Sequence, residues 1–168
     1  MTIIVDKVNE WLGASLQYRR DDLEEFIKRG HEGSLLLCEG VSNCGLFALA
    51  VWKAAGVRHA LLEQPYQVGM AIAWIKIIAT DLGARRTVRA DGLPTPGALC
   101  HYYSPRPSTN DHVEFILETP DPESGKALHA GGGRPHCEIS SSISDVRWSS
   151  GRPLQYWYDA AALLPGGE

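Results

Sequence analysis

Three residues that lie far apart in the sequence carry side chains suited to nucleophilic catalysis at a carbonyl. Cys44 follows the turn-like sequence EGVSN and opens the helical pattern CGLFALAVWKAAG. A thiol at the start of a helix lies near unpaired N–H groups and the positive end of the helix dipole, which lower its pKa and favour the thiolate. His112 opens HVEFILE, and His129 lies in ALHAGGG after the turn-like PDPESG. Cys44 is therefore predicted as nucleophile and His112 as the base that takes and returns its proton.

The third residue of such a site would hold the imidazole of His112 in one orientation. Two neighbouring antiparallel strands would bring His129 close to His112, so His129 is predicted to fix the tautomer of the base. Alternation along HVEFILE places His112 and Glu114 on one side of the strand and Val113 and Phe115 on the other. The prediction requires the His112 side to face the helix of Cys44. Glu114 is a rival for the orienting role, although its place on the same strand predicts a less direct reach.

The remaining requirement is a group that stabilises the oxyanion formed when the thiolate attacks. The backbone N–H of Cys44, at the start of its helix, is predicted to supply this hydrogen bond. Asn43, which directly precedes the nucleophile, is an accessory candidate, and so is Glu114.

The elements that must position these residues divide the chain into a helical first half and a strand-rich second half. Helices are predicted over MTIIVDKVNEWLG, residues 21–30, residues 44–56 and residues 67–83, with Gly30, Gly56 and Gly83 as stop signals. Short strands are predicted at ALCHYY, HVEFILE, ALHAG, CEISSSI and LQYWY, between turns rich in Pro and Gly. This order predicts an α+β domain with an antiparallel sheet of about five or six strands.

Composition limits the classes to which the protein can belong. The chain has 168 residues, of which 44% are hydrophobic and 21% charged, so it is expected to form one globular domain over residues 1–168. Residues 1–30 are assigned to N-terminal helices and residues 160–168 to a frayed tail. The net charge of −4 argues against nucleic acid as a partner, and the apolar runs are too short to span a membrane. Four cysteines are too few for a disulfide scaffold.

The pattern from Cys44 to His129, about half of the chain, resembles the NlpC-type cell-wall peptidases. NCGLFALAVWKAAGV resembles their nucleophile segment, PGALCHYY the Pro-Gly strand before the catalytic His, HVEFILE the strand of that His, and ALHAGGG the strand of the orienting His. The related CHAP amidases share this order. The resemblance implies a papain-like fold, no cofactor, and cleavage of an amide bond in the peptide part of peptidoglycan.

Two departures from the family pattern concern the surroundings of the nucleophile. The family usually has Ser-Gly after the catalytic Cys, where this chain has Gly45 and Leu46. Many members have a Tyr a few residues before the Cys, where this chain reads LLLCEGVS. CHAP amidases usually use Glu and Asn after the His, so His129 fits the NlpC pattern better.

The start of the chain shows no secretory signal. A wall hydrolase without one would be made in the cytoplasm and reach the wall after lysis, injection or secretion. A phage lysis or tail enzyme, or an antibacterial effector, would fit this route. An immunity protein or a phage structural protein would then be its partner.

Other interpretations compete with the cysteine hydrolase. A transglutaminase-like Cys-His-Asp enzyme would also start a helix with Cys44, but it would need an Asp where His129 stands, and Asp121 lies in a predicted turn. An inactive papain-like module that binds a wall peptide or a protein would keep the fold without the chemistry.

Two further sequence patterns could bind a ligand, but each has a simpler structural explanation. Zinc could use the adjacent pairs Cys100-His101 and His136-Cys137, but neighbouring strand residues point to opposite faces, so one pair rarely supplies two ligands. Gly131–Gly133 follows a predicted strand without a phosphate-loop Lys, and is interpreted as a turn. The aromatic residues near the C-terminus are assigned to the core in preference to a glycan-binding groove, and these are Trp148, Tyr156, Trp157 and Tyr158.

Overall fold

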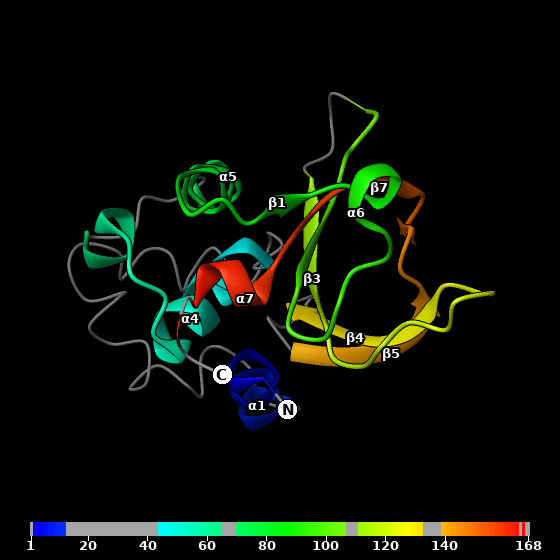
Figure 1. The fold of residues 1–168 in the computed structure, drawn as a ribbon, viewed down its shortest axis with the longest axis horizontal. Helices are drawn as coiled ribbons and strands as arrows, with labels where there is room; N and C mark the ends of the chain where they lie inside the picture. The colour runs from blue at the N-terminus through cyan, green and yellow to red at the C-terminus, as the bar shows by residue number, and fades with distance from the viewer. Residues whose placement is uncertain are drawn as a thin grey trace.

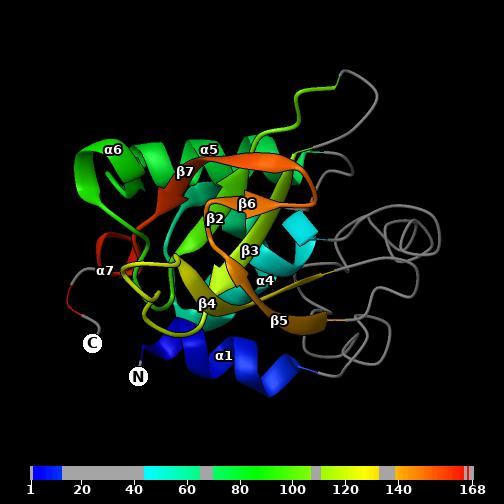
Figure 2. The same ribbon diagram turned by 90° about the vertical axis from the view of Figure 1, so that its right-hand side faces the viewer.

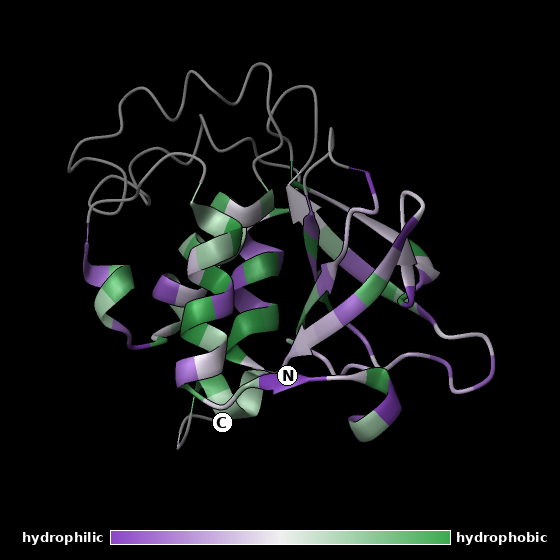
Figure 3. Ribbon diagram, turned by 90° about the horizontal axis from the view of Figure 1, so that it is seen from above, coloured by the Kyte–Doolittle hydropathy of each residue, from purple (hydrophilic) through white to green (hydrophobic). Residues whose placement is uncertain are grey.

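The fold consists of a layer of helices packed against one face of a twisted antiparallel sheet (Figures 1 and 3). A computed structural model describes residues 2–12, 44–64, 70–106, 111–132, 139–164 and 166. The predicted helix over residues 21–30 lies outside these ranges. The coarse α+β class with an antiparallel sheet is confirmed.

Three helices of the described ranges form the helical layer, and all three were predicted from their periodicity. They are α1 (Ile3–Trp11), α4 (Cys44–Ala55) and α5 (Ala71–Asp81). Shorter helical turns connect or end the strands: η2 (Ala60–Glu63), α6 (Val88–Asp91) and α7 (Ala160–Leu163). No helix in the described ranges is long and apolar enough to cross a membrane.

Seven strands pair antiparallel within the described ranges. They are β1 (Arg85–Arg86), β2 (Leu99–Tyr102), β3 (His112–Ile116), β4 (Lys126–Gly132), β5 (Ile139–Asp145), β6 (Trp148–Ser149) and β7 (Arg152–Tyr158). The order across the sheet is β1-β7-β2-β3-β4-β5, and β6 pairs with β7. The two strands that sequence patterns missed, β1 and β6, have two residues each, which is too short for alternation to be visible.

Helix α4 lies in the centre of the molecule, with ten of its twelve residues buried. Phe47 makes an edge-to-face contact with Phe115 of β3 at 5.8 Å between ring centroids and a tilted contact with Trp11 of α1 at 5.7 Å. A Cβ on Gly45 would lie 2.6 Å from the Cβ of Ala71, so glycine allows the starts of α4 and α5 to touch. Gly45 thus has a packing role directly after Cys44.

The Pro-Gly turn before β2 holds the start of the chain. Gly97 has φ +87°, which glycine adopts without strain, and its N–H donates to the carbonyl of Ile116 at 2.7 Å. A Cβ at Gly97 would come within 2.5 Å of the Thr2 hydroxyl oxygen, and this hydroxyl caps α1. Figure 2 shows α1 running from the N-terminus below β4 and β5. The Pro-Gly motif is therefore structural in this chain.

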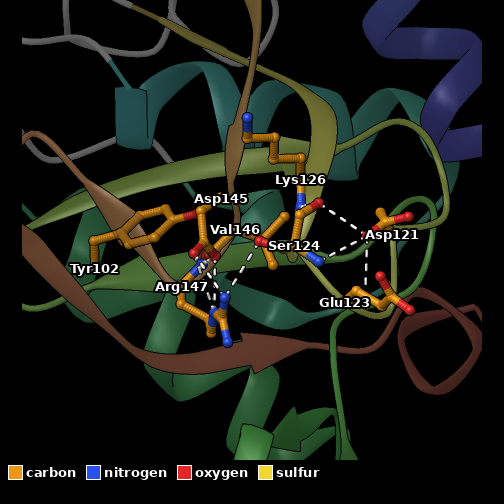
Figure 4. Close-up of polar contacts among 8 residues, drawn as sticks. All are labelled: Tyr102, Asp121, Glu123, Ser124, Lys126, Asp145, Val146 and Arg147. Atoms are coloured by element: carbon orange, nitrogen blue, oxygen red, sulfur yellow. Dashed lines mark hydrogen bonds and ion pairs between the residues drawn. The ribbon is translucent and has the colours of Figure 1, made fainter.

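Two turns on the side of the sheet away from α4 are joined by polar contacts (Figure 4). Asp121 closes its turn by accepting a hydrogen bond from the N–H of Ser124 at 2.7 Å. Arg147 pairs with Asp145 at 2.8 Å and donates to the carbonyl of Ser124 at 3.2 Å. The Asp121 carboxylate makes its hydrogen bonds within this turn, whereas the carboxylate beside His112 is that of Glu114, so Asp121 is not the acidic residue of the predicted site.

The structure contradicts two of the smaller predictions. Ala160 and Leu163 are buried in the core, so the chain does not fray from residue 160; α7 begins there, with the Asp159 side chain as its cap. Gly131 and Gly132 lie in β4 and pair with β5, so they are not a turn. Gly131 does not form a turn; its small size is what the neighbouring Glu114 and Val113 require.

Candidate active site

Cys44 and His112 meet at one end of the sheet, where α4 and β3 each begin. Cys44 is the first residue of α4 and is 5% exposed, and His112 is the first residue of β3. Their side chains are hydrogen-bonded to each other. Burial alone would lower the pKa of His112, but the hydrogen bonds to Cys44 and Glu114 outweigh it and raise this pKa to about 10. The structure thus brings together the predicted nucleophile and base.

Glu114 lies between the two histidines of the site. Its Oε1 is 2.9 Å from Nε2 of His112, and its Oε2 is 2.6 Å from Nδ1 of His129. Burial would raise the pKa of Glu114, but the hydrogen bonds to both imidazoles outweigh it and lower this pKa to about 2. Glu114 is therefore a carboxylate at neutral pH that accepts one hydrogen bond from each ring.

The direct contact expected between His129 and His112 is absent, and Glu114 takes its place. Both ring nitrogens of His129 have other partners, since Nδ1 contacts Glu114 and Nε2 contacts the hydroxyl of Ser144. His129 is 3% exposed, so these contacts satisfy a buried ring. The reach of Glu114 is more direct than its place on the same strand predicts, because a glutamate side chain is long enough to reach back along its own strand.

The result is one continuous chain of hydrogen-bonded side chains. It runs through Cys44, His112, Glu114, His129 and Ser144. Ser144 was missed by sequence reasoning, and no local signal could have revealed it. It belongs to the serine-rich β5, and only the pairing of Ala127 with Ser144 brings it beside His129.

The contact between Cys44 and His112 does not arise in the way that was expected. Val113 and Phe115 belong to the core cluster that includes α4, whereas Ile116 packs in a second cluster on the other face of the sheet. His112 and Glu114 therefore lie on the face turned away from the body of α4, and the requirement that this side face α4 is wrong. The thiol and the imidazole still meet because each belongs to the first residue of its element.

The ring of Tyr102 lies beside the imidazole of His112. The two rings are nearly parallel, 27° apart, with centroids separated by 6.4 Å, and they are register partners across β2 and β3. The Tyr102 hydroxyl donates to the carbonyl of Val146 at 2.8 Å (Figure 4), and burial raises its pKa, so the phenol stays neutral. Tyr102 is therefore the β2 neighbour of the His112 ring, and sequence analysis did not single it out.

Gly131 on β4 makes room for the carboxylate. A Cβ there would lie 3.1 Å from Cγ of Glu114 and 3.3 Å from the carbonyl oxygen of Val113. Such contacts are tighter than ordinary van der Waals packing, so a larger residue would displace the Glu114 side chain.

The other candidate residues lie outside this chain of contacts. Asn43 and the pair His136-Cys137 fall outside the described residues. Cys100 is in the second core cluster, while the neighbouring His101 bonds with Tyr158 of the α4 cluster, so the pair faces opposite sides. Within the described ranges, no three His, Cys, Asp or Glu side chains form a group that could hold a metal ion.

The C-terminal aromatic residues divide between core and surface. Trp157 and Tyr158 are buried, as expected, whereas Trp148 on β6 is 56% exposed. Tyr156 is partly buried against the α4 cluster.

No family model, curated protein or solved structure matches this chain. The interpretation of the site therefore depends on its own geometry. In that geometry the buried thiol of Cys44 is hydrogen-bonded to the imidazole of His112. The same imidazole is hydrogen-bonded through Nε2 to the carboxylate of Glu114. Nucleophile, base and orienting acid in this order constitute the arrangement used in covalent catalysis.

Proposed function

We propose that the protein is a cysteine hydrolase of papain-like type that cleaves an amide bond in a peptide. The observation that carries the proposal is the chain from Cys44 through His112 to Glu114. A structural cysteine in a core needs neither a base nor an ionised acid behind that base. Burying the ionised pair of His112 and Glu114 is costly unless both groups have hydrogen-bond partners. Here His112 contacts Cys44 and Glu114, and Glu114 contacts both imidazoles.

The tautomer of His112 follows from its contact with Glu114. Nε2 donates its hydrogen to the carboxylate, which leaves Nδ1 as the nitrogen that takes the thiol proton of Cys44. The thiolate then attacks the carbonyl carbon, and the oxyanion accepts a hydrogen bond from the backbone N–H of Cys44 at the start of α4.

The second half of the reaction returns the proton. His112 protonates the departing amine as the C–N bond breaks, and the acyl group stays on Cys44 as a thioester. His112 then takes a proton from water, whose oxygen attacks the thioester and releases the acid. Each proton moves through His112, so no cofactor is required.

The proposed substrate is the peptide part of peptidoglycan, in a stem or a cross-link. Its support is the resemblance to NlpC-type and CHAP enzymes in the order Cys44, Pro96-Gly97, His112, His129. In this proposal the protein is a phage lysis or tail enzyme or an antibacterial effector that acts on the cell wall.

Acyl transfer to an amine, as in transglutaminases, is a second candidate. It is favoured by one observation, which is that the group behind His112 is a carboxylate. The thioester on Cys44 would be the same in both reactions, and the acceptor, water or a primary amine, decides between them.

The test uses purified full-length protein and muropeptides, with products identified by mass spectrometry. Cys44→Ala should lower the cleavage rate by about a thousandfold or more, because the nucleophile is lost. Cys100→Ala is the matched control, since it removes a buried thiol from the other core cluster. Its rate should stay within a few-fold of wild type.

The outcomes of this test distinguish a hydrolase from an acyltransferase and from an inactive binding module. Equal fragments from wild type and Cys44→Ala would refute Cys44 as nucleophile. Products extended by an added primary amine, in place of hydrolysed ones, would favour acyl transfer. Binding of muropeptides without any turnover would indicate an inactive module.

A further inference from the structure

A second polar chain lies on the face of the sheet that packs against the helices, and the proposed mechanism does not use it. His101 on β2 is fully buried. Its Nδ1 is 2.7 Å from the hydroxyl of Tyr158 on β7, and its Nε2 is 2.7 Å from Oδ2 of Asp111. The other oxygen of Asp111 accepts the N–H of Ser104 at 2.8 Å.

The position of Asp111 connects this chain to the site. Asp111 directly precedes His112, the first residue of β3, and the pair Tyr102–His112 ends the register between β2 and β3. Beyond this last backbone pair, the side chain of Asp111 keeps the start of β3 attached to β2. One of its oxygens bonds with His101 on β2, and the other bonds with Ser104 just after β2. This attachment fixes the backbone from which the imidazole of His112 extends towards Cys44.

The pKa shifts of His101, Asp111 and Tyr158 indicate which of these groups carry a charge. Burial, the largest influence, lowers the pKa of His101, which is therefore neutral. Burial would raise the pKa of Asp111, but hydrogen bonds from Ser104 and His101 outweigh it and lower this pKa, so Asp111 is a carboxylate. His101 thus donates from Nε2 to Asp111 and accepts at Nδ1 from Tyr158, whose pKa burial raises.

Other charges face this chain from the neighbouring elements. Lys76 of α5 acts electrostatically on both His101 and Asp111. Arg85 of β1 lies 4.9 Å from the ring centre of Tyr156, which in turn packs near His101. A buried imidazole and a partly buried carboxylate cost desolvation that apolar residues of similar size would not, so stability alone does not account for them.

We propose that the chain Tyr158–His101–Asp111 positions His112 relative to Cys44 by fixing the start of β3. This inference rests on the proposed pairing of nucleophile and base. His101 and Asp111 are positioning residues, because they act through the backbone of His112 and touch no reacting atom.

The test measures how the alkylation of Cys44 by iodoacetamide depends on pH, with Cys44 resolved from the other cysteines by tandem mass spectrometry. In wild type the reactivity should rise well below the free-thiol pKa of about 8.5. Asp111→Ala should move this rise upward by about one pH unit. Its kcat should fall by about 100-fold with little change in KM, because a misplaced base impairs the chemistry and not the binding.

Three variants separate positioning from a general loss of stability. Asp111→Asn keeps an oxygen for the N–H of Ser104, and its amide NH2 can donate to Nε2 of His101 once that ring carries its hydrogen on Nδ1 and donates it to the Tyr158 hydroxyl. Asp111→Asn should therefore recover most of the wild-type profile. Tyr158→Phe loses only the hydroxyl and keeps its edge contact with Trp52, so it should shift the profile less, in the same direction. Asp159→Ala removes the cap of α7 and should leave the profile unchanged even where its melting temperature falls.

The outcomes keep this inference apart from the proposed function. If Asp111→Ala and Tyr158→Phe both lower the melting temperature but leave the pH dependence of alkylation unchanged, the hydrogen bonds among Tyr158, His101 and Asp111 only stabilise the fold. A shifted profile in a protein that cleaves no muropeptide would support positioning and refute the proposed substrate. A wild-type profile that rises only near pH 8.5 would refute the pairing itself, and with it both proposals.

Discussion

The two faces of the sheet each carry a hydrogen-bonded set of histidine, carboxylate and hydroxyl groups, and the two sets differ in charge. On the face away from α4, Glu114 lies between His112 and His129, and the pKa of His112 is raised. On the face towards α4, His101 lies between Asp111 and a phenol, and its pKa is lowered. The same residue types thus produce an ionised pair on one face and a neutral imidazole on the other.

The difference comes from what lies at the end of each set. The first set ends at the thiol of Cys44, whose hydrogen bond and electrostatic interaction with His112 raise the pKa of this imidazole. The second set ends at the hydroxyl of Tyr158, whose raised pKa prevents it from giving up a proton. In the proposed function, only the His-carboxylate set that ends at the thiol takes part in the reaction.

The largest effect that would test this comparison is expected at Glu114. Glu114→Gln keeps the length of the side chain but removes the charge that stabilises protonated His112. We expect kcat to fall by about 100-fold or more, as with other substitutions of an orienting acid. The control is Glu118→Gln, the same change at an exposed residue just after β3, which should leave kcat unchanged. Equal rates in the two variants would contradict an orienting role for Glu114.

Glu114→Gln should also change how the free energy of unfolding depends on pH. The pKa of Glu114 lies below its usual 4.5, so its contribution to stability is present above pH 4.5 and is lost as pH falls towards 2. The pKa of His112 lies above its usual 6.5, so its contribution is present below pH 6.5 and is lost as pH rises through about 10. Urea unfolding should therefore show the greatest loss in Glu114→Gln between pH 4.5 and 6.5.

A smaller effect is expected at His129, which supports Glu114 from behind. His129→Ala should lower kcat by about tenfold and leave a measurable rate, because Glu114 keeps its direct contact with His112. His129→Asn, which can still donate to the carboxylate, should recover part of this loss. The measurement is turnover of the muropeptide substrate at one pH for all three proteins. A loss as large as that of Cys44→Ala would mean that His129 acts on substrate directly.

The sequence predicted the site more fully than it predicted the contacts within it. The helix start at Cys44 and the strand start at His112 were visible because caps, glycines and alternation are local signals. The place of Glu114 between two rings was not, since strand alternation says which face a side chain takes and nothing of how far it reaches. Ser144 and Tyr102 depend on strand register, and register is set by pairing across the sheet.

The smallest effect is expected at Gly131, and a double variant makes it informative. Gly131→Ala would place a Cβ 3.1 Å from Cγ of Glu114, which should shift the carboxylate slightly and lower kcat several-fold. If the loss arises through Glu114, the same change made in Glu114→Gln should cost little more, because the ionic contact is already gone. The rates of the four proteins form a double-mutant cycle. Independent losses that simply multiply would show that Gly131 acts through the backbone of β3, where the carbonyl of Val113 lies 3.3 Å from the added atom, and not through the carboxylate.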